Sequence, residues 1–300
     1  MILEYITLVL IAILSMIVSG NNLSAAVGTI VGSKIVSRYF GLLLGAGGFS
    51  LGLIIEGRFL SDSVFRIMPD VPYYIVVVLA ISFVLFAVAT YFHIPLSLTM
   101  AIVGISLGVS LRVSFTPDLI YVYLVISAWV LAPILSIISS FYLNRKVTSL
   151  SINDVWRAAR LYKILLVVIS FLTAFTLGAN TFGLLAAMGH DSIVIISVMI
   201  LAIFAGAIFL SGGVIKRVSQ DIFGMRYANA FVSLLISSVL VEGATFFSLP
   251  LSNTQTLTSS VFGSGLSYNT KAIMSRPFLQ VVAMWVISPL FGMLLGFLFA

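Results

Sequence analysis

Long runs of hydrophobic residues, each about as long as a membrane is thick, dominate the pattern along this chain. A helix crosses the roughly 30 Å core of a bilayer with about twenty residues. Because the runs are continuous, and not alternating segments of about ten residues, they predict transmembrane helices and not barrel strands. The runs occupy 2–19, 39–56, 71–92, 119–142, 161–178, 192–211, 227–247 and 278–299.

Two further segments, 95–111 and 250–267, are less apolar and rich in Ser, Thr and Gly. We expect both to enter the membrane as well. The sequence therefore predicts an all-α integral membrane protein with about ten crossings, including broken or re-entrant helices.

Composition agrees with this class, because 61% of the 300 residues are hydrophobic and only 8% are charged. Soluble domains are roughly a quarter charged. The chain has no cysteine, which excludes disulfides and thiolate catalysis. With only two histidines, His93 and His190, we expect no metal site and no cofactor. The apolar start lacks a basic leader and a cleavage pattern, so we expect a first membrane helix there and not a removed signal peptide.

The basic residues predict the orientation in the membrane. The polar stretch 143–163 carries five of them against a single acid, Asp154, which favours the cytoplasmic side. With ten crossings, all of the 15 Lys and Arg except Arg58, Arg66 and Arg112 fall on that side. Both termini are then external in a multi-pass protein of the cell membrane. In this setting the net charge of +6 marks topology and does not indicate a nucleic-acid partner.

Motifs in the first half recur in the second half, in the same order and at nearly the same offset. WVLAP (129–133) returns as WVISP (285–289), IPLSLTMAIVG (94–104) as LPLSNTQTLTS (249–259), and SGNN (19–22) as GANT (178–181). We divide the chain into repeats at 1–142 and 164–300, joined by the linker 143–163. Five crossings in each repeat force the second repeat to run in the opposite sense, which is the architecture of many secondary transporters.

The recurring motifs combine residues that can bind a small anion. Gly beside Asn lets a helix break and free backbone groups, and Pro95 and Pro250 predict helix starts with hydroxyls in the first turn. A helix N-terminus with hydroxyl donors favours an oxyanion. Ser and Thr also serve close packing in membrane helices, which is the alternative for each hydroxyl. The predicted substrate-binding residues are Asn21, Asn22, Ser97, Thr99, Asn180, Thr181, Ser252 and Thr254.

At these motifs the chain resembles the inorganic phosphate transporter (PiT) family over essentially its whole length, as does GGVIKR at 212–217. The resemblance implies uptake of inorganic phosphate coupled to sodium or protons, and the family includes a branch of sulfate permeases. The family pattern follows Asn with Asp and has a second Asn three residues further on. Here Asn22 and Ala25 stand in the first copy and Thr181 and Leu184 in the second, so both carboxylates are absent.

This loss leaves two substrates open. A carboxylate can accept the proton that phosphate still carries near neutral pH, whereas sulfate has no proton to donate. We place phosphate first and sulfate second. An anion channel and a membrane-embedded enzyme are the alternatives from other classes, although no HExxH or GxSxG motif is present. The expected partners are the anion and the lipid bilayer, with a homodimer as a candidate assembly.

Three titratable residues are candidates for coupling to H+ or Na+. Glu242 lies well inside an apolar run, where an ionisable group is costly and by default functional. Glu56 ends a run beside Arg58, so an interfacial ion pair is the simpler interpretation of that residue. His93 directly precedes the first PLS motif, where it either titrates near physiological pH or serves as an interfacial ring.

Overall fold

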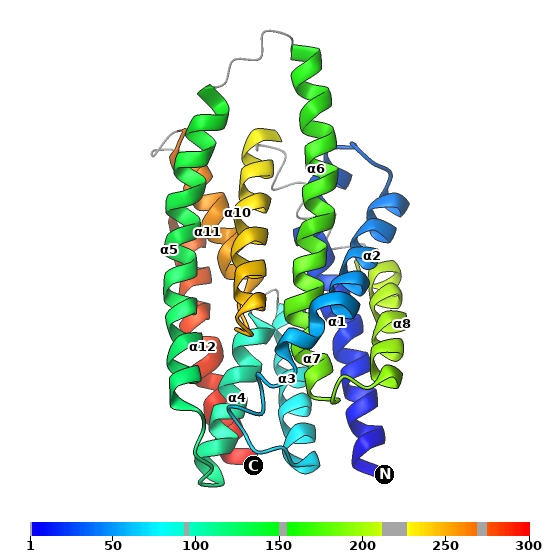
Figure 1. Ribbon diagram of the computed structural model, residues 1–300, viewed down its shortest axis with the longest axis vertical. Coiled ribbons are helices and arrows are strands. Elements are labelled where there is room, and N and C mark those ends of the chain that lie inside the picture. The colour runs from blue at the N-terminus through cyan, green and yellow to red at the C-terminus, as the bar shows by residue number, and fades with distance from the viewer. Residues whose placement is uncertain (1, 93–95, 150–154, 212–226, 269–274) are drawn as a thin grey trace.

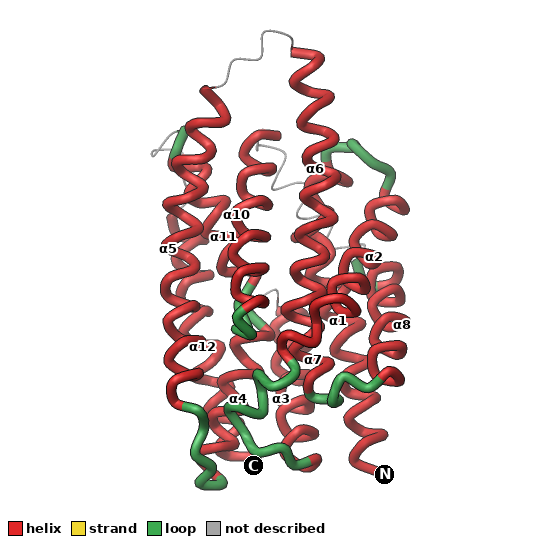
Figure 2. Tube along the Cα trace, viewed as in Figure 1, coloured by secondary structure: helices red, strands yellow, loops and turns green. Residues whose placement is uncertain are grey.

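The structure, a computed structural model, describes residues 2–92, 96–149, 155–211, 227–268 and 275–300 (Figure 1). The described part is a bundle of helices without strands (Figure 2). The first half contains α1 (Ile2–Gly32), α2 (Arg38–Glu56), the 3₁₀ helix η1 (Gly57–Leu60), α3 (Pro72–Phe92), α4 (Leu98–Arg112) and α5 (Leu119–Ser149). The second contains α6 (Val155–Leu177), the π turn η2 (Gly178–Phe182), α7 (Gly183–Ala187), α8 (Ile193–Phe209), α10 (Tyr227–Phe246), α11 (Asn253–Leu266) and α12 (Ser275–Phe299).

Length and hydropathy make the bundle a membrane protein. Seven helical segments of the described chain are long and apolar enough to cross a bilayer, and α4 and α8 are shorter apolar helices. Large hydrophobic side chains remain exposed along these helices, such as Tyr39, Ile120 and Leu201. Exposed side chains of this kind are favourable where lipid, and not water, surrounds the protein. The predicted all-α membrane class is confirmed.

The path of the chain explains how the two halves are inverted. The N- and C-termini lie at the same end of the bundle, and α5 and α6 carry the chain to the opposite end and back (Figure 1). Helices α3 and α4 lie in the half of the bundle near the termini, whereas α10 and α11 lie in the other half. The two helices of each pair enter the bundle and return at the same end, so a pair adds no full crossing. The helices of each half that do cross are then odd in number. The predicted inverted repeat with re-entrant helices follows from this arrangement.

The returning helix of each pair packs on the long helix of the other half, α4 on α12 and α11 on α5. Glycines allow this close approach. A Cβ at Gly104 would lie 2.2 Å from the carbonyl oxygen of Pro289, and a Cβ at Gly263 would lie 2.3 Å from that of Ile137. Small residues of this kind let membrane helices pack backbone to backbone. Each half therefore packs its returning helix against a long helix of the other half, and these two contacts hold the halves together.

The expected helix break at SGNN is wrong, because α1 continues without interruption from Ile2 to Gly32. Gly20 instead makes room for α8: a Cβ there would lie 2.5 Å from the Cβ of Leu210. In the second copy, GANT does interrupt the helix, as the π turn Gly178–Phe182 between α6 and α7. The same motif thus serves close packing in one half and a change of helix geometry in the other.

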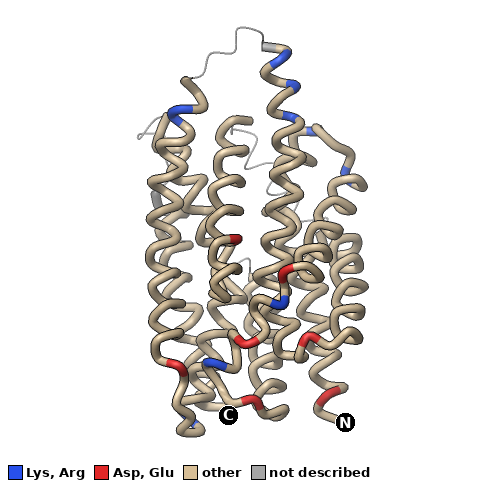
Figure 3. Tube along the Cα trace, in the orientation of Figure 1, with Lys and Arg blue, Asp and Glu red and all other residues tan. Residues whose placement is uncertain are grey.

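Charge divides the two ends of the bundle (Figure 3). Most of the basic residues of the described chain lie where α1 meets α2, where α5 ends and where α6 begins. Acidic residues predominate at the end with the termini. There Arg66 pairs with Asp118 at 2.6 Å. The backbone N–H of Tyr121 and the Arg66 guanidinium lower the pKa of the Asp118 carboxyl.

Candidate functional site

A cavity of about 220 Å³ lies where the tips of the two inverted helix pairs approach each other, beside α1 and the π turn η2. Its volume suits a small inorganic ion with some water, since a water molecule takes roughly 30 Å³. Six of the eight predicted substrate-binding residues line it: Asn22, Ser97, Thr99, Thr181, Ser252 and Thr254.

Ser97 and Ser252 begin α4 and α11 in nearly the same way. Both have extended backbone angles, φ −89° and ψ 113° for Ser97, φ −79° and ψ 112° for Ser252. Each hydroxyl oxygen accepts the backbone N–H three residues on, from Met100 and Gln255 respectively, at 3.4 Å. The predicted helix starts are therefore confirmed. Since the hydroxyl oxygen acts as acceptor in the cap, its proton remains free to donate to a ligand.

Two helix N-termini thus face one cavity, and none of its described lining residues is charged. The first turns of α4 and α11 supply backbone N–H groups and the positive ends of two helix dipoles. Thr99 and Thr254 are the second residues of α4 and α11, and their hydroxyls add further donors. Chemically, this set favours an anion without contributing a fixed positive charge.

Asn180 does not line the cavity and is fully buried. Its amide nitrogen donates to the hydroxyl of Thr245 at 2.9 Å and to the carbonyl of Leu249 at 3.1 Å. Its oxygen accepts the backbone N–H of Leu251, also at 3.1 Å. The side chain is therefore used to hold the segment before Ser252 in place.

Asn21 also lies away from the cavity lining. It is partly buried on α1, and its backbone carbonyl accepts a hydrogen bond from the hydroxyl of Ser24 at 3.0 Å. Because α1 is a continuous helix here, Asn21 and its neighbour Asn22 point in different directions, and only Asn22 reaches the cavity.

Sequence analysis missed three polar residues of the lining: Ser24, Asn253 and Thr258. Asn253 directly follows the capping Ser252, and its side-chain oxygen accepts the hydroxyl of Ser237 at 3.1 Å. Its place within the PLSNT motif could have identified it. Ser24 of α1 and Thr258 of α11 lie far apart in the sequence, and only the fold shows that they border the same cavity.

Of the coupling candidates, Glu56 and Glu242 come together, while His93 lies outside the described residues. The two carboxyl groups lie within hydrogen-bonding reach of each other. The ion pair expected between Glu56 and Arg58 is wrong, because no salt bridge joins them in the described structure and Glu56 meets an acid from α10 instead.

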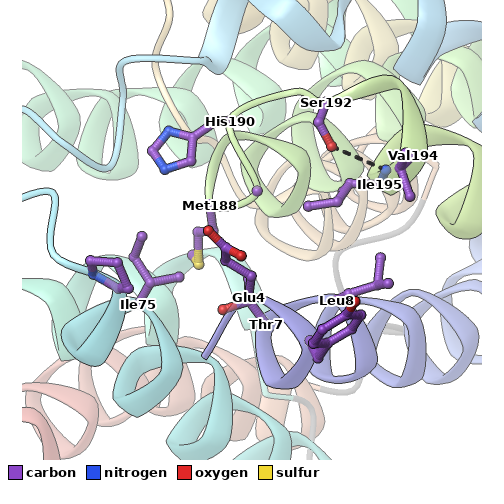
Figure 4. Close-up of a pocket in the computed structure, with 12 residues that line it drawn as sticks. Glu4, Thr7, Leu8, Ile75, Met188, His190, Ser192, Val194 and Ile195 are labelled. Atoms are coloured by element: carbon purple, nitrogen blue, oxygen red, sulfur yellow. Dashed lines mark hydrogen bonds between the residues drawn. The ribbon is translucent and has the colours of Figure 1, made fainter. Parts of the chain in front are cut away.

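A second cavity, of about 480 Å³, lies near the chain termini (Figure 4). Apolar side chains such as Ile75 and Met188 form much of its wall, with Glu4 and His190 at its polar edge. None of the predicted site residues lines it. Its Glu4 carboxylate would repel an anion, so the smaller cavity, whose described lining carries no charge, is the candidate anion site.

Comparison with known proteins agrees with this geometry. The model of the phosphate transporter family matches residues 18–158 and 144–296. A Methanocaldococcus jannaschii protein assigned as a phosphate permease is 23% identical over 94% of this chain and 92% of its own length. A Bacillus subtilis protein assigned as a low-affinity inorganic phosphate transporter is 27% identical over 66% of this chain and 65% of its own length.

The fold has a solved counterpart. A structure of a sodium-dependent phosphate transporter superposes with a TM-score of 0.86 and covers 99% of this chain and 98% of its own, at 16% sequence identity. At this low sequence identity, the structural similarity shows the fold alone. Together with the family match over both halves, it establishes that this chain belongs to the phosphate transporter family.

Proposed function

We propose that this protein is a secondary transporter that carries inorganic phosphate across the cell membrane and binds it in the cavity between the inverted repeats. The observation that carries the proposal is the pair of capped helix starts, Ser97 and Ser252, at one uncharged cavity. A tetrahedral oxyanion would accept hydrogen bonds from both hydroxyls, from Thr99 and Thr254, and from first-turn N–H groups.

Asn22 and Thr181 fit phosphate in particular. Each side chain can both donate and accept, so one of them can accept the proton that phosphate carries near neutral pH. Sulfate offers acceptors only, and it remains the second candidate substrate for the same donors. The phosphate permease names of the relatives favour phosphate.

Asn180 has a supporting role in this proposal, and Asn21 is not part of the cavity lining. The substrate shell is then Asn22, Ser97, Thr99, Thr181, Ser252 and Thr254, with Ser24, Asn253 and Thr258 added. Transport would expose this shell alternately to the two sides as one repeat moves against the other. The repeats are 1–142 and 164–300, with 143–163 as linker. No chemical conversion of the anion is part of this function.

The basic end of the bundle is cytoplasmic in this proposal, and both termini are external. The concentration of basic residues around the α5–α6 connection supports this orientation. Accumulation of phosphate requires a coupling ion, H+ or Na+. The cavity has no carboxylate among its described lining residues, which favours protons or membrane potential over strict sodium dependence.

Uptake of labelled phosphate and sulfate into proteoliposomes tests the proposal. Saturable phosphate uptake that responds to an imposed ion gradient supports a secondary transporter. Uptake that does not saturate and follows only the anion's own gradient indicates a channel instead.

A further inference from the structure

Two acidic side chains meet within the membrane-spanning part of the bundle. Glu56 is the last residue of α2, and Glu242 lies on α10, with their carboxyl groups in hydrogen-bonding reach. One oxygen of each carboxyl is buried and has no hydrogen-bond partner. The Glu56 side chain is not used to cap η1, which begins at the next residue.

No base balances this pair among the described residues. Neither carboxyl takes part in a salt bridge there, and Arg58, the nearest base along the chain, has an exposed side chain. Helix α10 packs against α5, α6, α11, η1 and η2. Glu56 is the one titratable group that those described elements bring against Glu242. Beside the pair, Phe59 of η1 stacks on Phe246 of α10 with ring centroids 5.3 Å apart.

Two carboxylates at this distance cannot both be ionised without strong repulsion, and water does not screen them well at this depth. A hydrogen bond between them also needs a proton, because an ionised carboxylate is only an acceptor. Contact between the two carboxyl groups is therefore favourable only with a proton between them, which makes the pair a candidate proton-binding site.

We propose that Glu56 and Glu242 form one proton-binding site that couples proton movement to anion transport. The proposal rests on the proposed function, because it assigns the ion that drives phosphate accumulation. It assigns the proton to a place outside the anion cavity, where the last residue of α2 in one repeat meets α10 of the other. Loss of the shared proton would drive the two helices apart at this contact.

A short chain of contacts links the pair to the anion cavity. Glu242 and Thr245 lie on the same face of α10, three residues apart. The Thr245 hydroxyl accepts the amide of Asn180, and Asn180 holds Leu251, the residue before the helix-capping Ser252. On the other side, a Cβ at Gly183 would lie 2.7 Å from the carbonyl oxygen of Gly57. A shift of α10 against α2 would thus reach the tip that lines the cavity.

The test uses the full chain in proteoliposomes with the membrane potential clamped. Labelled phosphate is followed in two modes, accumulation driven by an imposed pH gradient and exchange against internal phosphate without a gradient. We expect Glu56→Gln and Glu242→Gln each to reduce gradient-driven accumulation at least tenfold, with exchange kept within about threefold. Glu4→Gln, the same substitution away from this contact, should change neither mode.

The outcomes separate this proposal from the function on which it rests. Wild-type protein that exchanges phosphate but gains nothing from a pH gradient overturns the proton site and leaves the transporter standing, and this arm does not depend on how the variants fold. Full gradient-driven accumulation in both glutamine variants overturns it as well. Absence of both exchange and uptake in the wild type contradicts phosphate transport itself.

Discussion

The side-chain oxygen of Asn180 accepts the backbone N–H of Leu251 at 3.1 Å, which ties the π turn of one helix to the tip that precedes α11. The same amide binds the carbonyl of Leu249 at 3.1 Å. Leu249 and Leu251 both precede Ser252, the N-cap of α11, so the helix itself cannot satisfy their backbone groups and the Asn180 side chain does. Asn180 therefore sets the geometry of the cavity without lining it.

Asn180→Ala should destabilise the protein. It should also make the anion affinity vary among molecules of the sample, because the segment before α11 is no longer held in one position. It leaves a buried donor and a buried acceptor unpaired, at about 1–3 kcal/mol each. Thermal unfolding in detergent measures the effect. Thr176→Ala is the matched control, since that buried hydroxyl donates only to the carbonyl of Thr173 in its own helix. Equal stability losses in the two variants would refute the supporting role of Asn180.

Ser97→Ala and Ser252→Ala should each weaken phosphate binding to a similar degree, because the two serines are related by the repeat. Loss of a hydrogen bond to a charged ligand costs about 1.5–3 kcal/mol, roughly ten- to a hundred-fold in affinity. Their effects should not simply add, since both hydroxyls contact the same ion. Isothermal titration with the single and double variants checks this, and Ser106→Ala in the interior of α4 serves as control.

The same serines cap their helices, so their loss also costs roughly 0.5–2 kcal/mol of stability. Thr99→Val and Thr254→Val separate the two effects, because these hydroxyls line the cavity and the caps stay intact. We expect affinity to fall in both valine variants while the unfolding temperature stays near that of the wild type. Unchanged affinity in both would place the anion elsewhere.

Single-cysteine labelling can test the orientation cleanly in a chain without cysteine. A cysteine in place of Ser149, at the basic end of α5, should be protected from an impermeant reagent added to intact cells. A cysteine in place of the exposed Thr116, before α5, should react. The reverse labelling pattern would show that the protein has the opposite orientation in the membrane.

Sodium dependence should be weak, because Asn22 and Thr181 stand where the family pattern has carboxylates. Neutral side chains bind sodium less strongly than carboxylates do, since they bring no opposite charge. Replacing sodium by choline at fixed pH and potential measures this, and less than about a twofold change in uptake rate is expected. Uptake that vanishes without sodium would show that other oxygen atoms form the sodium site.

The helices could be predicted because a membrane helix requires a long apolar run in the sequence. The inversion could be predicted because the repeated motifs occur in the same order in both halves. Contacts between distant segments could not. The role of Gly20 depends on Leu210, almost two hundred positions away in the chain. The partner of Glu56 is an acid on α10, whereas the local sequence suggested Arg58. Six of the eight candidate site residues line one cavity because the first turns of α4 and α11 border the same space, which only the fold shows.

Transport of labelled phosphate by the purified protein in proteoliposomes tests the central claim most directly. The account predicts saturable uptake that sulfate inhibits weakly and that Thr254→Val slows by reducing affinity. Liposomes containing the well-folded wild-type protein that take up no more phosphate than empty liposomes, under any imposed proton, sodium or potential gradient, would contradict it.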